Sequence, residues 1–369
     1  MTKSATKEGT THYARRFAGR AADGHFRETQ RMVLSSLGIG TYLGQPDEKT
    51  DAAYTAAVVA AVENGINVID SAINYRFQRS ERSIGAALQQ LAAKGFSREE
   101  IVVCTKGGYL TPDGSMPADP NEYFFREYIQ HGIFSAKDLA AGSHCMVPRF
   151  LKDQLGRSLK NLGVECVDVY YLHNPETQLS EIPKPEFLQR VRTAFEFLES
   201  AVEAGEIRYY GLATWNGFRQ DPRARDAMQL GEIAQIAQEI AGGMHHFRFV
   251  QIPFNLGMPE ALTQGNQILR ERERTVVEAA GDLDVTVIAS ASLLQGQVAR
   301  NLPGFVAEAF GLENDAERAL QFVRSAPGIT TALVGMSRLE HAKANARLVG
   351  VPPATTEDFS NLFSRGEGA

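Results

Sequence analysis

Short apolar runs alternate with longer amphipathic segments along most of the chain. The runs are rich in Val, Ile and Tyr, which is typical of buried β-strands, whereas the longer segments repeat apolar residues at helical spacing. We expect strands at residues 32–37, 67–70, 101–106, 167–173, 207–212, 247–253, 285–289 and 331–334. We expect helices at residues 50–63, 81–93, 150–161, 187–204 and 261–280.

This alternation predicts an α/β fold with a parallel sheet, because parallel strands need crossover helices and are covered on both faces. Eight strand–helix units favour a closed (β/α)8 barrel, or TIM barrel, over an open doubly wound sheet. The open sheet usually binds a dinucleotide through a GxGxxG motif after its first strand. The nearest match here is formed by Gly38, Gly40 and Gly44, and its last spacing is one residue too long.

The length of 369 residues fits one large domain or two smaller ones. The eight units place residues 31–369 in a single barrel domain, and residues 1–30 are interpreted as a polar extension. A long insertion at 107–148 and a second long loop at 293–327 exceed ordinary connections. Both follow predicted strands at the carboxyl end, the catalytic face of a barrel, so we expect lids or pocket walls. A packed decoration that serves an oligomer contact is the alternative.

Charge and composition exclude several functional classes. Lys and Arg total 38 against 44 for Asp and Glu, and a net charge of -6 disfavours a nucleic-acid partner. Three widely spaced cysteines without a CxxC pair indicate a reducing, cytoplasmic setting. The longest nearly apolar run, at residues 52–62, is too short to span a membrane.

No metal site is expected from the sequence. His245 and His246 are adjacent, as are His144 and Cys145, and adjacent side chains point to different sides of a strand or helix. Neither pair has the spacing of a typical zinc site.

Three titratable residues end three successive predicted strands. These residues are Asp70, Lys106 and His173, and Tyr75 follows five residues after Asp70. Taken singly, they have ordinary explanations as a helix cap, a solvated strand end, a buried core histidine and a packed aromatic ring. Their joint placement at neighbouring strand ends predicts one shared site, because the last side chains of barrel strands point into the mouth.

These four side chains have a clear electrostatic logic. A lysine beside a phenol is expected to lower the phenol pKa from about 10, and a carboxylate holds the lysine charged. The phenol then acts as a general acid, and the histidine orients a substrate carbonyl oxygen. The set has no electron source, so it requires a hydride-donating cofactor.

In order and local context, these residues resemble the catalytic tetrad of the aldo-keto reductases. Asp70 and Tyr75 lie in DSAINY, Lys106 in CTKGG and His173 in YYLHNPE. The resemblance extends over residues 34–348 and includes LGIGTY at 37–42, VQIPFN at 250–255, SLLQGQ at 292–297 and PGITTALVGMSRLEHAKANA at 327–346. It implies a (β/α)8 barrel that binds extended NADP(H) across the strand ends without a Rossmann domain.

The resemblance also implies a set of cofactor contacts. Near the nicotinamide it implies Gly40, Thr41, Tyr42, Asp70, Thr214 and Gln251. Around the pyrophosphate it implies Ser292, Leu293, Gln295 and Gly296. Toward the adenosine end it implies Gly335, Ser337, Arg338, His341 and Asn345, with Ser337 and Arg338 facing a 2′-phosphate.

Several positions depart from the family pattern. Ala213 and Thr214 stand where Ser-Asn or Ser-Arg is common, and Ser290 replaces the tyrosine that commonly stacks on the nicotinamide. His341 stands where Gln or Arg is usual. Arg338 still favours NADP(H), with NAD(H) as the alternative.

The resemblance implies an NADP(H)-dependent oxidoreductase that reduces an aldehyde, ketone or sugar carbonyl, with Tyr75 as the general acid. The substrate is a small molecule, and Arg76, Phe77, Tyr109 and Trp215 are the pocket candidates because each neighbours a tetrad strand end. Two alternatives stay open. One is a regulatory or binding subunit with slow turnover, and the other is an enzyme that uses bound nicotinamide for internal redox of a sugar derivative. The sequence does not fix the oligomeric state.

Overall fold

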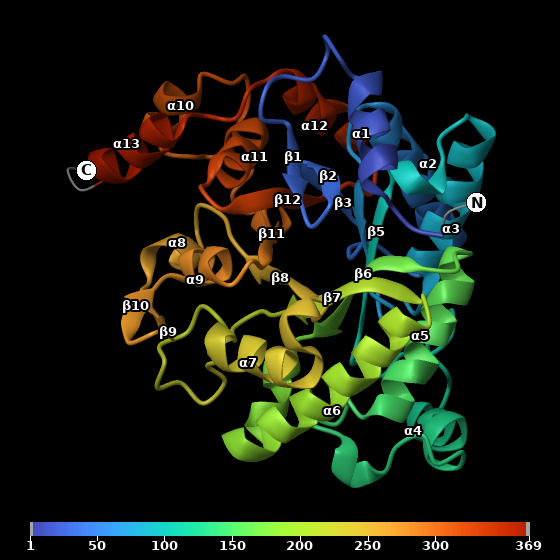
Figure 1. Ribbon diagram of the computed structural model, residues 1–369. Helices are drawn as coiled ribbons and strands as arrows, with labels where there is room; N and C mark the ends of the chain where they lie inside the picture. The colour runs from blue at the N-terminus through green and yellow to red at the C-terminus, as the bar shows by residue number, and fades with distance from the viewer. Residues whose placement is uncertain (1–2, 367–369) are drawn as a thin grey trace.

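The computed structural model describes residues 3–366, and its centre is a closed barrel of eight parallel strands (Figure 1). The barrel closes where the last strand pairs with the first, with Ala332 opposite Leu37 and Gly335 opposite Gly40. The (β/α)8 fold is therefore confirmed, and the open sheet is excluded. In barrel order the strands are β3 (Leu37–Gly40), β4 (Val68–Asp70), β5 (Val102–Gly107), β6 (Val167–His173), β7 (Ile207–Ala213), β8 (Phe247–Pro253), β11 (Thr286–Ser290) and β12 (Ile329–Gly335).

Helices surround the barrel and cover the outer face of the strands (Figure 1). Local sequence sets their ends: Asp47 caps one helix by accepting from Thr50 N at 2.8 Å, and Gly163 ends another with φ of 65°. The helices that follow the barrel strands are α2 (Glu48–Glu63), α3 (Arg79–Ala93), α5 (Pro148–Leu162), α6 (Lys184–Glu203), α7 (Leu230–Ala241), α9 (Val276–Asp282), α11 (Asp315–Ser325) and α12 (Leu339–Asn345). Further helices are α10 (Gly304–Phe310) and α13 (Thr356–Gly366), which contact each other.

The strand period places the candidate catalytic side chains inside the barrel. Alternate residues of a strand face the same side, and the inward rows begin with apolar residues such as Cys104 and Tyr171. Lys106 lies two positions after Cys104, and His173 lies two positions after Tyr171, so both face the barrel interior. Asp70 likewise ends the inward row of β4. The apolar rows fill the barrel, so these polar side chains come together at its carboxyl end.

The N-terminal segment is more ordered than a polar extension. Residues 1–30 include α1 (Lys7–Arg16) and β1 (Phe26–Thr29), which pairs with β2 (Met32–Ser35) in an antiparallel hairpin. The apolar pattern did not predict helix α1, because its buried face contains few apolar residues, chiefly Tyr13 and the adjoining Phe17. Ala5 N donates to buried Asp168 at 2.6 Å, so the segment before α1 is bound to strand β6.

The prediction of one strand at 32–37 was wrong in its extent. This segment is split between β2 and the barrel strand β3. The break lies at two serines: Ser35 Oγ donates to Leu37 O at 2.6 Å, and Ser36 N donates to His25 O at 2.6 Å. These local bonds turn the chain from the hairpin into the barrel.

Two other segments also differ from expectation. The expected helix at 261–280 is replaced by α8 (Glu260–Thr263), a hairpin of β9 (Gln267–Leu269) and β10 (Arg272–Arg274), and α9. Arg270 and Glu271 have φ of 50° and 62°, which suits a tight hairpin turn and ends a helix. The second long loop, 293–327, contains α10 and α11, and α11 buries Leu320 and Val323 against the barrel.

The insertion at 107–148 follows the carboxyl end of β5 and forms its own small core. It contains α4 (Pro120–Phe124), a π-helical turn at Phe125–Ile129 and a 3-10 turn at Ala136–Asp138. Tyr128, Phe134 and Cys145 pack together with Phe150 of α5. An isolated bridge between Tyr109 and His144 closes the base of the insertion, so both ends are fixed beside the barrel.

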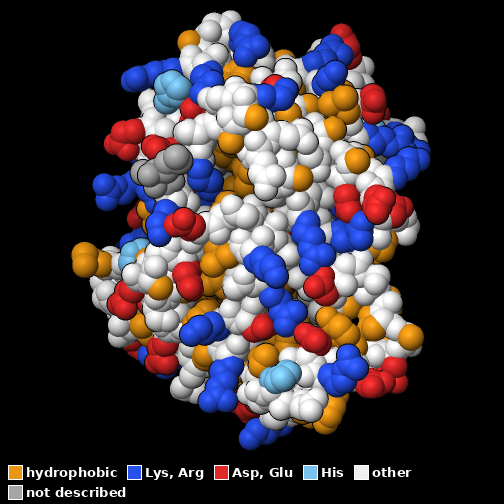
Figure 2. Space-filling view, turned by 90° about the vertical axis from the view of Figure 1, so that its right-hand side faces the viewer, with side chains coloured by type: hydrophobic (Ala, Val, Ile, Leu, Met, Phe, Trp, Pro, Cys, Tyr) orange, Lys and Arg blue, Asp and Glu red, His pale blue; other side chains and the backbone are white. Residues whose placement is uncertain are grey.

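The outer surface carries charges of both signs. On the face turned to the viewer in Figure 2, Lys and Arg side chains are interspersed with Asp and Glu. Across residues 3–366, the structure has no helix that is long and apolar enough to cross a membrane.

Candidate active site

A buried ion pair lies at the carboxyl end of the barrel. Lys106 Nζ lies 2.5 Å from Asp70 Oδ2, and their side chains are 1% and 6% exposed. Lys106 Nζ also donates to Ser71 O at 2.7 Å, while Gln251 Nε2 donates to Asp70 Oδ1 at 2.8 Å. A buried charge needs such compensation, and here Asp70 ends β4, Ser71 follows it, and Gln251 lies near the carboxyl end of β8.

Tyr75 lies above this ion pair on the loop after β4. Ile73 N donates to Lys106 O at 3.1 Å, and Tyr75 N donates to Ala72 O at 3.0 Å, so the loop is fixed against β5. Lys106 Nζ lies 5.1 Å from the Tyr75 ring centroid, and the centroids of the Tyr75 and His173 rings are 5.8 Å apart. The structure therefore brings Asp70, Tyr75, Lys106 and His173 into one group.

Burial dominates the acidity of the Tyr75 phenol. It raises the pKa of Tyr75 above the ordinary value of 10.0, and Lys106 offsets this effect only in part. The expectation that Lys106 brings the Tyr75 pKa below its ordinary value was therefore wrong. The consequence is a phenol that keeps its proton at neutral pH, which is the form a proton donor requires.

Lys106 is charged and His173 is neutral at neutral pH. Burial alone would lower the pKa of Lys106, but Asp70 and Tyr75 more than compensate, so this pKa is raised. Burial, with the nearby charge of Lys106, lowers the pKa of His173 well below its usual value. His173 is therefore a neutral hydrogen-bonding group beside a charged lysine.

The predicted nicotinamide-side residues surround this group. Thr41 follows β3 and its hydroxyl donates to Asp70 O at 3.1 Å, while the exposed Tyr42 ring lies 5.0 Å from the Tyr75 ring. Thr214 follows β7, and its buried hydroxyl has no hydrogen-bond partner among the described residues. Gln251 points to Asp70 instead of standing free.

The remaining predicted cofactor residues follow the neighbouring strands β11 and β12. Ser292 is buried, and within residues 3–366 its hydroxyl has no hydrogen-bond partner. Gln295 and Gly296 adopt positive φ of 53° and 89° in a short 3-10 turn. The others are Leu293 in the first loop, and Gly335, Ser337, Arg338, His341 and Asn345 along the second, where Arg338 and His341 are exposed and Asn345 is buried.

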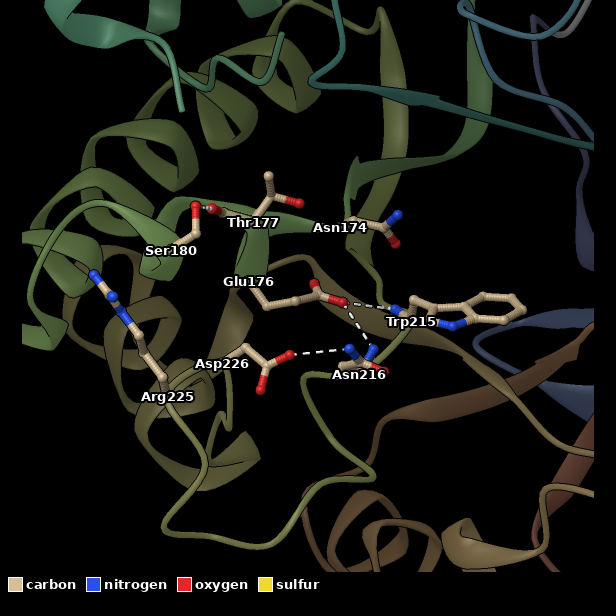
Figure 3. A pocket seen from close by; sticks show the side chains of 8 residues that line it. All are labelled: Asn174, Glu176, Thr177, Ser180, Trp215, Asn216, Arg225 and Asp226. Carbon is tan, nitrogen blue, oxygen red and sulfur yellow. Dashed lines mark hydrogen bonds between the residues drawn. The ribbon is translucent and has the colours of Figure 1, made fainter. Parts of the chain in front are cut away.

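A pocket of about 350 Å³ opens between the loops that follow β6 and β7, and most of the residues that line it are polar (Figure 3). Its base is Glu176, whose Oε1 accepts from Trp215 N at 2.7 Å and from Asn216 N at 3.0 Å. Asn216 Nδ2 in turn donates to Asp226 at 3.0 Å. The lining residues are Asn174, Glu176, Thr177, Ser180, Trp215, Asn216, Arg225 and Asp226.

A family model described as the aldo/keto reductase family matches residues 36–364. The chain belongs to the aldo/keto reductase family. This confirms the family resemblance seen in the sequence, and at the level of the family it supports an oxidoreductase.

Relatives of this aldo/keto reductase are distant in sequence. It is 26% identical over 211 residues to the NADH-specific methylglyoxal reductase of Escherichia coli, a match covering 56% of this chain and 55% of that protein. The chain therefore spans about half the length of that relative. It is 22% identical over 353 residues to the oxidoreductase YqkF of Bacillus subtilis, covering 91% of this chain and 94% of that protein.

Solved structures share the fold of this aldo/keto reductase. One is an aldo/keto reductase from Klebsiella pneumoniae in complex with NADP and acetate, with a TM-score of 0.60, 19% identity and coverage of 93% of this chain and 95% of that chain. Another is the holo form of the aldo-keto reductase AKR11C1 from Bacillus halodurans, with a TM-score of 0.62, 20% identity and coverage of 92% and 95%.

The four predicted pocket residues differ in where they lie relative to this pocket. Trp215 lines the pocket, and the Tyr109 hydroxyl borders it through Thr177 Oγ1 at 3.0 Å. Phe77 is not among the lining residues. Arg76 does not face the pocket either: it pairs with Asp51, and its side chain is only 1% exposed.

Among the residues that line this pocket, Trp215 alone was predicted from the sequence. Asn174 and Glu176 lie in the same HNPE stretch that carries His173, so proximity to the tetrad could have indicated them. Asp226 gives no such signal, because it reaches the pocket from a loop eleven residues beyond Trp215. Its approach depends on tertiary folding.

Proposed function

We propose that this protein is an NADP(H)-dependent oxidoreductase that reduces an aldehyde, ketone or sugar carbonyl to an alcohol. One observation carries the proposal: the buried Lys106–Asp70 ion pair lies beneath Tyr75 and beside His173 at the barrel mouth. A charged lysine near a proton-bearing phenol suits proton donation to an oxyanion as it forms.

The residues around the mouth fit an extended dinucleotide. Thr214 and Ser292 offer hydroxyl groups without partners in the described part of the chain, on the loops after β7 and β11. Gly335 is open to solvent at the end of β12, and exposed Arg338 suits a 2′-phosphate. The Klebsiella pneumoniae structure is a complex with NADP, which agrees with this choice, whereas the Escherichia coli relative is named as NADH-specific, which keeps NAD(H) as the alternative.

In the proposed reaction, NADPH supplies the hydride that reduces the carbonyl carbon. Tyr75 donates its phenolic proton to the carbonyl oxygen, and Lys106 stabilises the phenolate left behind. Asp70 keeps Lys106 charged and in place through the 2.5 Å contact. Neutral His173 donates a hydrogen bond that orients the carbonyl oxygen toward Tyr75.

Replacement of the proton donor tests this mechanism. We expect Tyr75→Phe to abolish turnover of a test aldehyde while NADPH affinity, measured by quenching of protein fluorescence, stays nearly unchanged. Tyr123→Phe removes a hydroxyl from the insertion instead and should keep full turnover. Activity like that of the wild type in Tyr75→Phe contradicts the assigned role.

A panel of carbonyl compounds separates the alternatives. Oxidation of NADPH with any of them, followed by absorbance, excludes the binding subunit. Turnover of a sugar derivative with no net change in nicotinamide absorbance supports internal redox instead. The departures at Ala213, Thr214 and Ser290 motivate the comparison, because they alter the surroundings expected for the nicotinamide.

A further inference from the structure

The backbone of His173 is held by a side chain from the insertion. His144 Nε2 lies 2.8 Å from the His173 carbonyl oxygen, and His144 is 1% exposed. His173 is the last residue of β6, so this bond fixes the end of the strand from a segment outside the sheet. The insertion thus contacts the predicted catalytic group directly.

The hydrogen bonds of His144 determine which ring nitrogen carries the proton. Arg190 Nη1 donates to Gln178 Oε1 at 2.6 Å, and an arginine can only donate. The Gln178 amide nitrogen therefore faces His144 Nδ1, at 2.8 Å, and donates to it. His144 Nε2 then carries the hydrogen that is donated to His173 O.

The ring of His173 is held by packing. Its Nδ1 is buried and has no hydrogen-bond partner in the part of the chain that the structure describes. The Tyr109 ring packs edge-on against both histidines, with its centroid 5.2 Å from the His173 ring and 4.9 Å from the His144 ring. The Tyr109 hydroxyl is fixed by Thr177 Oγ1 at 3.0 Å.

Gly108 permits this close approach. A Cβ at position 108 would lie 3.0 Å from His144 Nε2 and 3.2 Å from His173 O, the two atoms that form the hydrogen bond. The φ of Gly108 is 141°, which side chains rarely adopt. The absence of a side chain at position 108 therefore leaves room for the hydrogen bond between the insertion and His173.

We propose that Tyr109, His144, Gln178 and Arg190 form a positioning cluster that holds His173 in the orientation needed to bind the substrate carbonyl. His144 and Gln178 fix the His173 backbone, and Tyr109 fixes its ring. This inference rests on the proposed function, because it assigns His173 to carbonyl orientation. It gives the insertion a role in the rate of the reaction in addition to any role in substrate selection.

A pair of variants at His144 tests the hydrogen bond. His144→Leu removes the donor to His173 O, and we expect kcat to fall by about tenfold or more, since small displacements of catalytic groups are costly. His144→Gln replaces the donor with an amide and should restore most of kcat. Equal kcat values for the two variants, measured at temperatures well below both melting transitions, would overturn the proposal.

A second pair of variants, at Tyr109, tests the contact between the Tyr109 and His173 rings. It also tests the proposal if His144→Leu does not fold. Tyr109→Phe keeps the ring and loses only the hydroxyl, whereas Tyr109→Leu removes the ring. We expect a larger loss of kcat in Tyr109→Leu than in Tyr109→Phe, with the Kd for NADPH unchanged in both. Equal kcat values for the two variants contradict the role of the ring.

A measurement without turnover separates this inference from the proposed function. In ¹⁵N-histidine NMR of the whole protein at neutral pH, the His144 signals, assigned by their loss in His144→Gln, should show the neutral ring with its proton on Nε2. A proton on Nδ1 overturns the positioning cluster even if the enzyme is active. If the tautomer is as expected but no carbonyl compound is reduced by the wild type, the proposed function fails instead.

Discussion

Lys106 keeps its charge inside the barrel because three groups compensate for the loss of water. The carboxylate of Asp70 and the carbonyl of Ser71 accept its hydrogen bonds, and Gln251 satisfies the other carboxylate oxygen. Removal of one member of such a pair leaves the other charge buried without its partner, which costs more than the pair itself contributes. Lys106 and the groups that compensate it therefore act as a unit in stability as well as in chemistry.

We expect Lys106→Met to lower the free energy of unfolding by about 3–5 kcal/mol, because the charge of Asp70 remains buried. Lys94→Met is the matched control: Lys94 pairs with Glu63, but these side chains are 47% and 36% exposed. An exposed pair contributes about 0–1 kcal/mol. Urea unfolding of both variants measures the difference, and equal losses would contradict the account of the buried pair.

Residues that end strands could be placed from strand period, whereas loop residues could not be placed that way, and Tyr75 was identified by its DSAINY context. The apolar rows of β5 and β6 lead to Lys106 and His173, so strand period alone places both in the mouth. Arg76 also follows a tetrad strand, but its side chain turns back to Asp51 on α2. The direction of a loop side chain depends on partners that are distant in sequence, and no local pattern reveals them.

Among the elements, long apolar strands were the most predictable. The expected limits of β6 and β8 match the structure, because each strand is a seven-residue segment in which apolar and aromatic residues predominate. The expected helix at 261–280 failed because a charged stretch from Arg270 to Arg274 turns there in a hairpin. Helix α1 was missed because its few buried residues pack on distant parts of the chain.

Tyr13 connects α1 to helix α2. It is fully buried, its hydroxyl donates to Val62 O at 2.6 Å, and its ring lies 5.0 Å from the Phe17 ring. We expect Tyr13→Ala to cost about 3–5 kcal/mol through the cavity it leaves. Tyr13→Phe loses only the hydrogen bond and should cost about 1 kcal/mol.

Thermal and urea unfolding of the two Tyr13 variants provide the comparison. If α1 were a loosely attached extension, Tyr13→Ala would leave the unfolding midpoint close to that of the wild type. NADPH affinity should change little in either variant, because α1 contacts β2 and the 3-10 turn at Arg98–Glu100, which precedes β5, instead of the catalytic end of the barrel.

At the scale of the whole molecule, net charge and local charge have different consequences. The net charge of -6 is spread over a surface of mixed signs (Figure 2), while the proposed cofactor is itself an anion. Exposed Arg338, the residue before α12, and the backbone around it must therefore attract the proposed cofactor locally. The overall charge still argues against binding to nucleic acid.

Buried histidines should make the whole molecule sensitive to mild acid. Burial lowers the pKa of both His25 and His144 to about 4 from 6.5. The unfolded chain takes up these protons near pH 6.5 and the folded chain only near pH 4, so acidification through this window favours unfolding. We expect each histidine to remove about 2 kcal/mol of stability between pH 7 and pH 5.

Urea unfolding of the wild type and of His25→Gln at both pH values measures this effect. The ring of His25 contacts Gly65 O at 2.8 Å and Ser36 Oγ at 3.0 Å, so the variant should be less stable at pH 7 and lose less stability on acidification. His131→Gln removes an exposed histidine of the insertion and should follow the wild type. If stability falls by the same amount in His25→Gln as in the wild type, buried neutral His25 does not contribute to the acid sensitivity, and another group must account for it.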